Sequence, residues 1–245
     1  MSAEQDLDSR FVRAGALAES LERELARFVD EVEQGPFASG VSDGSLPVES
    51  VQFFVQQTYH LVMNDMGNLS IYVARARNEE EADFFLFMTI AEKLMLDSLY
   101  LLIDAIGIGR DRLAASKPDI RTAYRTNYFT RLALYHLPGD IALGILLNFP
   151  VWAGGARRVS QGLKDHYGLG KRVPGTDLLD VDVLDRFSQA TTGFQNMAKS
   201  IIGIDLCDDE AEKRMRRVAR LSVEYEAMVW HSYYTEGLRP AKSSG

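Results

Sequence analysis

A carboxylate inside an aromatic segment is the strongest candidate for chemistry in this chain. The segment reads EYEAMVWHSYY, and helical spacing places Ser222, Glu226, Trp230 and Tyr233 on one face. Aromatic surroundings exclude water from a carboxyl group and favour its protonated form, which is the form that a general acid needs. A structural glutamate held by a tyrosine or an arginine is the alternative. We take Glu226 as a candidate acid or base.

A polar stripe in the segment 48–77 is the second candidate. Thr58, Leu61, Asp65, Asn68 and Tyr72 recur at steps of three and four in a segment otherwise rich in Phe, Leu, Val and Met. Such a stripe either faces solvent or lines a wet cavity, and the spacing alone fits both.

Pro150 is the third feature, because it lies within the apolar run 141–156. A proline inside a helix cannot donate to the carbonyl four residues earlier, so we expect a kink there. Gly154 and Gly155 follow one turn later, where a ligand or another helix could approach closely. This run is shorter than the roughly 20 residues that span a bilayer, and we interpret it as a buried core helix.

The known metal and nucleotide motifs are absent from the sequence. The four histidines lie in different segments, and there is no HExxH, CxxC, GxGxxG or Walker sequence. The basic residues between 213 and 220 share an amphipathic helix with Glu210, Glu212 and Glu224, which is typical of a solvated helix face. We therefore expect no metal site, no cofactor and no nucleic-acid partner.

Composition and charge fit a folded domain that is not built to bind polyanions. Of 245 residues, 46% are hydrophobic and 25% are charged, which excludes a disordered polymer. The net charge of −8 argues against an extended phosphate-binding surface. A single cysteine, Cys207, cannot form an internal disulfide, and the first ten residues lack the order of a signal peptide. We expect a cytoplasmic protein without a membrane partner.

The hydrophobic periodicity predicts an all-α fold with about seven long helices. We expect one domain over residues 1–237 and a polar tail over 238–245. The predicted helices cover about 8–34, 48–77, 78–107, 120–137, 140–167, 178–204 and 208–236, with a loop at 35–46. Asn78 before three glutamates predicts a helix cap.

Three segments resemble the TenA family, the thiaminase II proteins of the heme-oxygenase-like fold. They are GPFASGVSDGSLPVESVQFFVQQTYHL, the Pro150-Val151-Trp152 triplet and EYEAMVWHSYYTEG, in family order and spacing over about residues 10–237. The resemblance implies a heme-oxygenase-like helical bundle, a pocket for a small molecule and a homo-oligomer, either a dimer or a tetramer.

The resemblance preserves only part of the family's catalytic set. The substrate-gripping aspartate corresponds to Thr58, a pocket tyrosine to Leu61, the nucleophilic cysteine to Val151 and a second pocket tyrosine to Gly155. The resemblance therefore implies that thiamine hydrolysis by the family route is lost.

Two catalytic positions of the family survive, as Tyr128 and Glu226. We expect both to face an enclosed cavity between the segments 48–77, 120–137, 140–167 and 208–236. Asp65, Trp152 and Trp230 are expected to join the ligand-binding wall with Thr58, Leu61, Val151 and Gly155.

A di-iron relative of the same fold is a poorer match. Its late helix corresponds to Leu178, Asp182 and Asp185, and its Glu and His seven residues apart correspond to Glu92 and Leu99. No acid lies between residues 140 and 165 to bridge two irons. The pocket histidines and arginines of the cofactor-independent oxidase PqqC have no counterparts that we can locate.

Three functions remain open on the sequence. The first is a TenA-like enzyme that acts on a small nitrogen-containing metabolite by acid/base chemistry, without a cofactor and without the cysteine. The second is a binding or regulatory protein that kept the pocket, and the third is an iron enzyme with a reduced ligand set. Fold alone does not choose among them.

Overall fold

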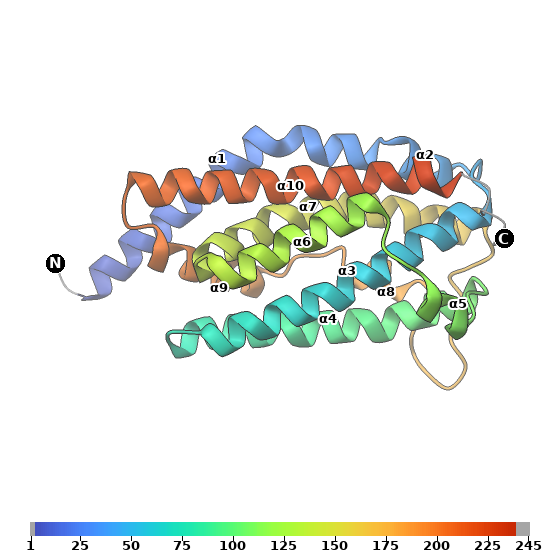
Figure 1. Ribbon diagram of the computed structural model, residues 1–245, viewed down its shortest axis with the longest axis horizontal. Helices are drawn as coiled ribbons and strands as arrows, with labels where there is room; N and C mark the ends of the chain where they lie inside the picture. Colours follow the sequence, from blue (N-terminus) through green and yellow to red (C-terminus); the bar gives the residue numbers. More distant parts are fainter. Residues whose placement is uncertain (1–2, 239–245) are drawn as a thin grey trace.

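The computed structural model describes residues 3–238, and these residues form an elongated bundle of helices (Figure 1). The helices are α1 (Ala3–Glu33), α2 (Pro36–Ser42), α3 (Val48–Arg75), α4 (Glu79–Ala105), α5 (Arg110–Ala115), α6 (Ile120–Tyr135), α7 (Pro138–His166), α8 (Asp182–Arg186), α9 (Thr192–Asp205) and α10 (Asp209–Gly237). Within the described part the only β pairing is an isolated bridge between Arg172 and Leu179. The all-α prediction is confirmed.

Most predicted helix ends agree with the structure because their local signals are strong. The side chain of Asn78 accepts a hydrogen bond from the Glu81 amide, as the predicted cap requires. The side chains of Asp119, Thr191 and Asp208 cap α6, α9 and α10 in the same way. The seven expected helices are therefore present, six of them as single elements.

Two predictions about helix boundaries were wrong. The expected loop at 35–46 contains α2, which begins at Pro36 and buries Phe37 and Val41 in the core. Proline suits the first turn of a helix, because the amide hydrogen that it lacks would be unpaired there. The expected helix at 178–204 is split into α8 and α9. The first helix ends at Arg186, and the second begins after the cap residue Thr191.

α7 is the central helix and contacts α1, α2, α8, α9 and α10. It is also the only helix among residues 3–238 that is long and apolar enough to span a bilayer, and 83% of its apolar window is buried within the fold. This agrees with the interpretation of the run 141–156 as a core helix. Pro150 lies inside α7, which continues on both sides of it.

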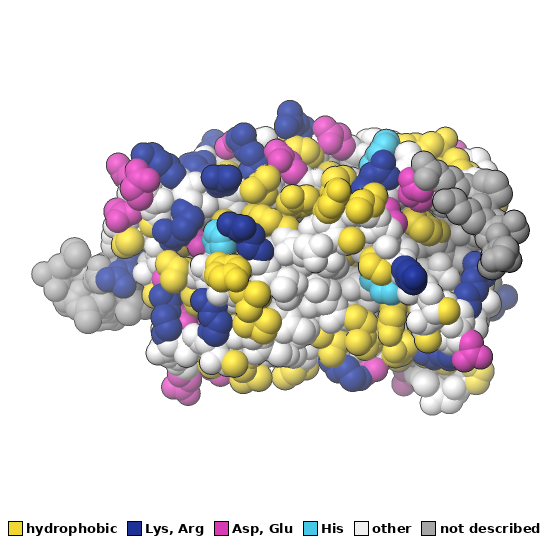
Figure 2. Space-filling model, in the orientation of Figure 1, with side chains coloured by type: hydrophobic (Ala, Val, Ile, Leu, Met, Phe, Trp, Pro, Cys, Tyr) yellow, Lys and Arg dark blue, Asp and Glu magenta, His cyan; other side chains and the backbone are white. Residues whose placement is uncertain are grey.

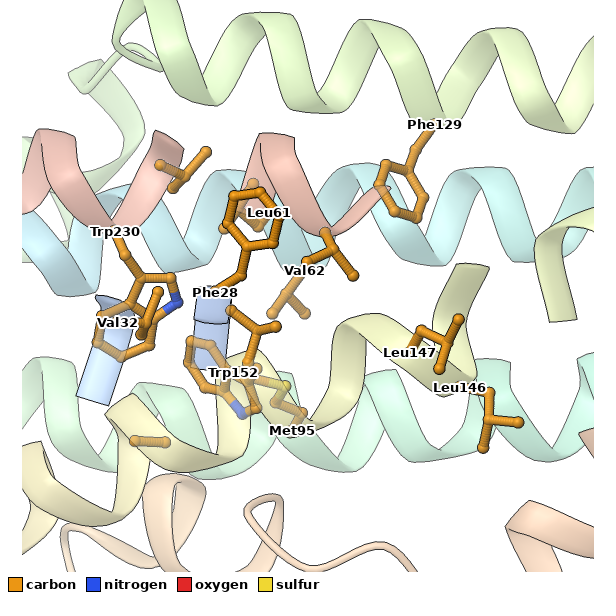
Figure 3. Close-up of a cluster of buried hydrophobic side chains, with 14 of the residues drawn as sticks. Phe28, Val32, Leu61, Val62, Met95, Phe129, Leu146, Leu147, Trp152 and Trp230 are labelled. Carbon is orange, nitrogen blue, oxygen red and sulfur yellow. The ribbon is translucent and has the colours of Figure 1, made fainter. Parts of the chain in front are cut away.

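The second layer of the bundle is the α3–α4 hairpin, which lies along the lower edge of Figure 1. α3 also contacts α6 and α10, and α4 reaches α8 and α9. Figure 3 shows Leu61 of α3, Met95 of α4 and Trp152 of α7 near one another in the interior. A cavity lies between this hairpin and the helices α6, α7 and α10.

The predicted solvated face of α10 is confirmed by its ion pairs. Lys213 pairs with Glu210, Arg216 with Glu212, and Arg220 with Glu24 of α1. On the face shown in Figure 2, cations are interspersed with acidic and hydrophobic side chains. The predicted polar tail lies outside the described residues from position 239 onwards.

The contact between α7 and α2 gives a test of the packing. A Cβ atom on Gly162 would lie against the Val41 carbonyl oxygen and 2.6 Å from its carbonyl carbon, so Gly162→Ala must push two backbones apart. We expect a loss of about 1–3 kcal/mol in the free energy of unfolding, measured by urea denaturation.

Gly67→Ala is the matched control, because Gly67 is exposed in α3 with nothing within 4 Å of its added Cβ. This change should raise stability by about 0.5–1 kcal/mol, since alanine is the better helix former. Equal effects of the two substitutions would contradict the close approach of α2 to α7.

Candidate functional site

A cavity of about 300 Å³ lies between α3, α4, α6, α7 and α10, with the segment 186–194 as a further wall. This volume is at the lower end of the range for small-molecule sites. Phe87 and Arg186 line the cavity while remaining largely exposed, so it opens to solvent beside α4 and α8. The cavity is therefore accessible on this side, where the sequence predicted an enclosed one.

The polar stripe of α3 lines this cavity. Thr58, Leu61, Asp65, Asn68 and Tyr72 all contribute to its wall, which decides between the two interpretations that the sequence left open. Asn68 donates to Asn64, and Thr58 donates to the Phe54 carbonyl at 2.9 Å. Asp65 is the stripe residue that carries charge into the cavity.

One guanidinium connects the charged groups of the site. Arg125 of α6 donates from Nη1 to both oxygens of Asp65 at 2.7 Å, and from Nε to Glu226 Oε2 at 3.3 Å. Its side chain is only 7% exposed, and its guanidinium lies over the Phe129 ring. Arg125 therefore joins α3, α6 and α10 through a buried network.

Sequence reasoning missed Arg125. The available signal was an arginine on the apolar face of its helix, since Phe129 and Leu132 follow at steps of four and seven and are buried with it. An arginine in that position needs a buried carboxylate partner.

Glu226 lies at the cavity as predicted and is 2% exposed. Its Oε2 accepts hydrogen bonds from Arg125 and from Asn148 Nδ2 at 3.3 Å, and its Oε1 accepts one from Trp230 Nε1 at 3.1 Å. All three partners donate, so both oxygens of the carboxyl group act as acceptors. From the sequence we expected aromatic neighbours from the same helix around Glu226 and did not foresee the donors from α6 and α7.

Two further carboxyl groups of the cavity are harder to ionise. Burial raises the pKa of Asp65, and the nearby Arg125 opposes that rise. Burial raises the pKa of Glu92 to about 8, and the negative charge of Asp65 adds to the effect. Glu92 lies on α4, which the predicted cavity did not include.

Several buried polar atoms of the cavity wall have no partner within the described chain. They are Tyr72 Oη, Glu92 Oε2, Asn148 Oδ1 and Trp152 Nε1. An unpaired buried polar atom costs about 1–3 kcal/mol, so a ligand that pairs with these atoms gains binding free energy.

The structure does not bring all of the predicted site residues together. Tyr128 lies outside the cavity wall, where its hydroxyl donates to the Val218 carbonyl at 3.4 Å and its ring contacts Tyr225. It follows Arg125 by three residues, and in this helix the arginine rather than the tyrosine points inward. The prediction that Tyr128 faces the cavity was wrong.

The four aromatic and small residues of the predicted wall have different roles. Trp152 lines the cavity, whereas Val151 is buried outside it. Trp230 donates to Glu226, and Gly155 makes room for Trp230, since an added Cβ would lie 2.6 Å from Cζ3 of the Trp230 ring.

Two of the residues that correspond to di-iron ligands are engaged in other contacts. Asp185 pairs with Lys164 and accepts from Ser160, and Asp182 pairs with Arg186. Within residues 3–238, no group of three or more His, Cys, Asp or Glu side chains is arranged to hold a metal ion.

Solved structures of similar proteins share the architecture at low sequence identity. A TenA homologue from Pyrococcus horikoshii OT3 superposes with a TM-score of 0.70 at 15% identity, covering 90% of this chain and 99% of its own. A TenA family transcription regulator from a Silicibacter species gives 0.67 at 16% identity, with 91% and 97% covered.

A third similar structure supports the predicted fold by its description. It is a domain of unknown function with a heme oxygenase-like fold from Shewanella denitrificans OS217, with a TM-score of 0.71 at 15% identity. It covers 89% of this chain and 92% of its own. The predicted heme-oxygenase-like bundle is confirmed.

At the level of sequence, no curated protein matches the chain. The profile of the TENA/THI-4/PQQC family does match it, over residues 24–236. Because that match spans most of the sequence and the bundle agrees with it, the chain belongs to the TENA/THI-4/PQQC family.

Proposed function

We propose that this protein is a TenA-like enzyme that transforms a small nitrogen-containing metabolite by acid/base chemistry, without a cysteine nucleophile. The observation that carries the proposal is the pair of carboxylates, Asp65 and Glu226, held by one buried arginine at the wall of a ligand-sized cavity. Carboxylates positioned in this way accept N–H donors and move protons.

Glu226 is the residue that we assign to proton transfer. Its Oε1 accepts one hydrogen bond, from Trp230, so that oxygen keeps a lone-pair site for a ligand proton. Arg125, Asn148 and Trp230 fix its orientation. Holding a ligand against a fixed acid/base group lowers the barrier through positioning as well as through proton transfer.

A binding or regulatory protein is the second candidate. The absence of cysteine and serine from the cavity wall formed by residues 58–226 favours it. Cys207 is exposed and does not line the cavity, and the Thr58 hydroxyl is bonded to a backbone carbonyl. One similar structure is described as a transcription regulator. A binder would use the same network to hold its ligand unchanged.

We also propose that the chain works in the cytoplasm as a homo-oligomer, either a dimer or a tetramer. Leu86, Ile90 and Leu94 of α4 form an exposed apolar stripe at steps of four, 45–59% exposed, which a second copy would cover. Light scattering should give the mass of two or four chains, and a monomer at micromolar concentration would contradict this.

Glu226→Gln separates the two candidate functions. The ligand is first found by thermal-shift screening, and its turnover is measured by mass spectrometry of the product. The enzyme proposal predicts that Glu226→Gln lowers this turnover by about 10²–10⁴-fold. A pure binder would show no turnover in the wild type and a loss of about 1–3 kcal/mol in affinity.

Glu224→Gln is the matched control on the same helix, because Glu224 does not line the cavity. It should leave both readouts unchanged. Wild-type turnover and affinity in Glu226→Gln would contradict both functions.

Thiamine and aminomethyl-pyrimidine substrates should not be hydrolysed, because Val151 provides no nucleophile and Thr58 no carboxylate. Chromatography of overnight reactions should show no pyrimidine product above the protein-free blank. Val151→Cys should remain inactive, since the side chain at 151 does not reach the cavity. Robust hydrolysis by the wild type, or its appearance in Val151→Cys, would overturn this assignment.

A further inference from the structure

The cavity holds more acidic groups than its one buried cation can pair. Asp65 from α3, Glu92 from α4 and Glu226 from α10 all interact electrostatically with Arg125 from α6. Arg125 makes hydrogen bonds with Asp65 and Glu226 and makes none with Glu92. Glu92 is therefore the acid of the site that is left without a partner.

The other charged group that borders this cavity is Arg186 of α8. Its side chain is 58% exposed and pairs with Asp182 at 3.0 Å, so solvent and that carboxylate already accommodate its charge. No hydrogen bond or ion pair joins it to Glu92 in the described structure. Arg125 attracts an ionised Glu92 but is hydrogen-bonded to Asp65 and Glu226, so no cation of the described wall forms an ion pair with Glu92.

Two buried donors without a hydrogen-bond partner line the same cavity, and they are evidence for a ligand that does not depend on the acidic groups. Trp152 is 9% exposed with an unpaired Nε1–H, and Tyr72 is 1% exposed with an unpaired hydroxyl. Both residues line the cavity. Natural proteins rarely leave such buried donors unpaired unless water or a ligand satisfies them.

A second unpaired acceptor belongs to Asn148. Its Nδ2 donates to Glu226, which leaves its Oδ1 as a buried acceptor in the cavity wall. Asn148 and Trp152 are one turn apart on α7, so their side chains are neighbours at about 6 Å. The wall thus offers acceptors at Glu92 and Asn148, and a donor at Trp152 Nε1, one turn along α7 from Asn148.

We propose that Glu92 is the binding residue for a primary amine of the ligand, which enters as an ammonium ion and donates to Glu92 and Asn148. Trp152 Nε1 then donates to an acceptor atom a few bonds along the same ligand. The apolar side chains of the wall contact the ligand's carbon skeleton. This proposal rests on the proposed small-molecule function. It adds that the ligand is a cation and that Glu92 binds its charged group.

Binding of an ammonium ion at this position must displace a proton. The pKa of Glu92 is raised to about 8 by burial, so most of the empty protein carries this carboxyl in its neutral form at pH 7. The ammonium charge stabilises the carboxylate, so Glu92 ionises as the cation binds and its proton leaves to the buffer. An uncharged ligand of the same shape would release no proton.

The test uses a panel of small arylalkyl amines, each with the alcohol that replaces its ammonium group, and 2-phenylethylamine with 2-phenylethanol is the first pair. Titration calorimetry at pH 7 in two buffers of different ionisation enthalpy gives both affinity and proton release. We expect a wild-type preference of at least tenfold for the amine, with release of close to one proton per amine bound.

Glu92→Gln should remove both the amine preference and the proton release, while the alcohol binds as before. The variant should fold, because glutamine matches the neutral carboxyl in shape. Asp97→Asn is the control on the same helix, since its exposed carboxylate pairs with Lys93 and it does not line the cavity. It should behave as the wild type.

The proposal is overturned if no amine binds better than its alcohol, or if Glu92→Gln keeps the preference and the proton release. These results are independent of turnover. Glu92-dependent amine binding together with turnover that ignores Glu226→Gln would refute the acid/base assignment alone. Glu226-dependent turnover of a ligand that Glu92→Gln binds normally would refute the amine site alone.

Discussion

The site depends on one buried guanidinium, Arg125, placed between two carboxylates from different helices. Asp65 and Glu226 would repel each other and resist burial without it, and Arg125 itself has no solvent to hold its charge. The interaction joins α3, α6 and α10, which carry three walls of the cavity. Substituting any one of the three residues leaves the remaining charges unbalanced.

Close packing around α7 also positions the site. α7 makes close contacts at two glycines, Gly162 against α2 and Gly155 against Trp230. Asn148 and Trp152, which helical spacing places on the same face of α7 as these glycines, line the cavity. Trp230 therefore has two roles, since it fills the space beside Gly155 and also donates to Glu226. Packing and charge position the same carboxylate.

The sequence predicted elements with strong local signals and missed contacts between distant segments. Hydrophobic period and caps such as Asn78 predicted the long helices. The polar stripe of α3, at steps of three and four, identified residues that line the cavity but did not by itself distinguish a cavity from solvent. Arg125 and Glu92 were not assigned to the site, because their roles arise only where α4 and α6 meet α3 and α10. Tyr128 was misplaced because its position was inferred from the family resemblance, whereas its orientation depends on the helix face that Arg125 occupies.

The central role of Arg125 is tested most directly by comparing the free energy of unfolding of Arg125→Met with that of the triple variant that adds Asp65→Asn and Glu226→Gln. Urea denaturation at pH 8 should show a loss of about 3–5 kcal/mol for Arg125→Met, because two buried carboxylates lose their shared partner. The triple variant should recover most of that loss, since its buried groups are neutral. Wild-type stability in Arg125→Met, or a triple variant no more stable than it, would contradict the central role of this arginine.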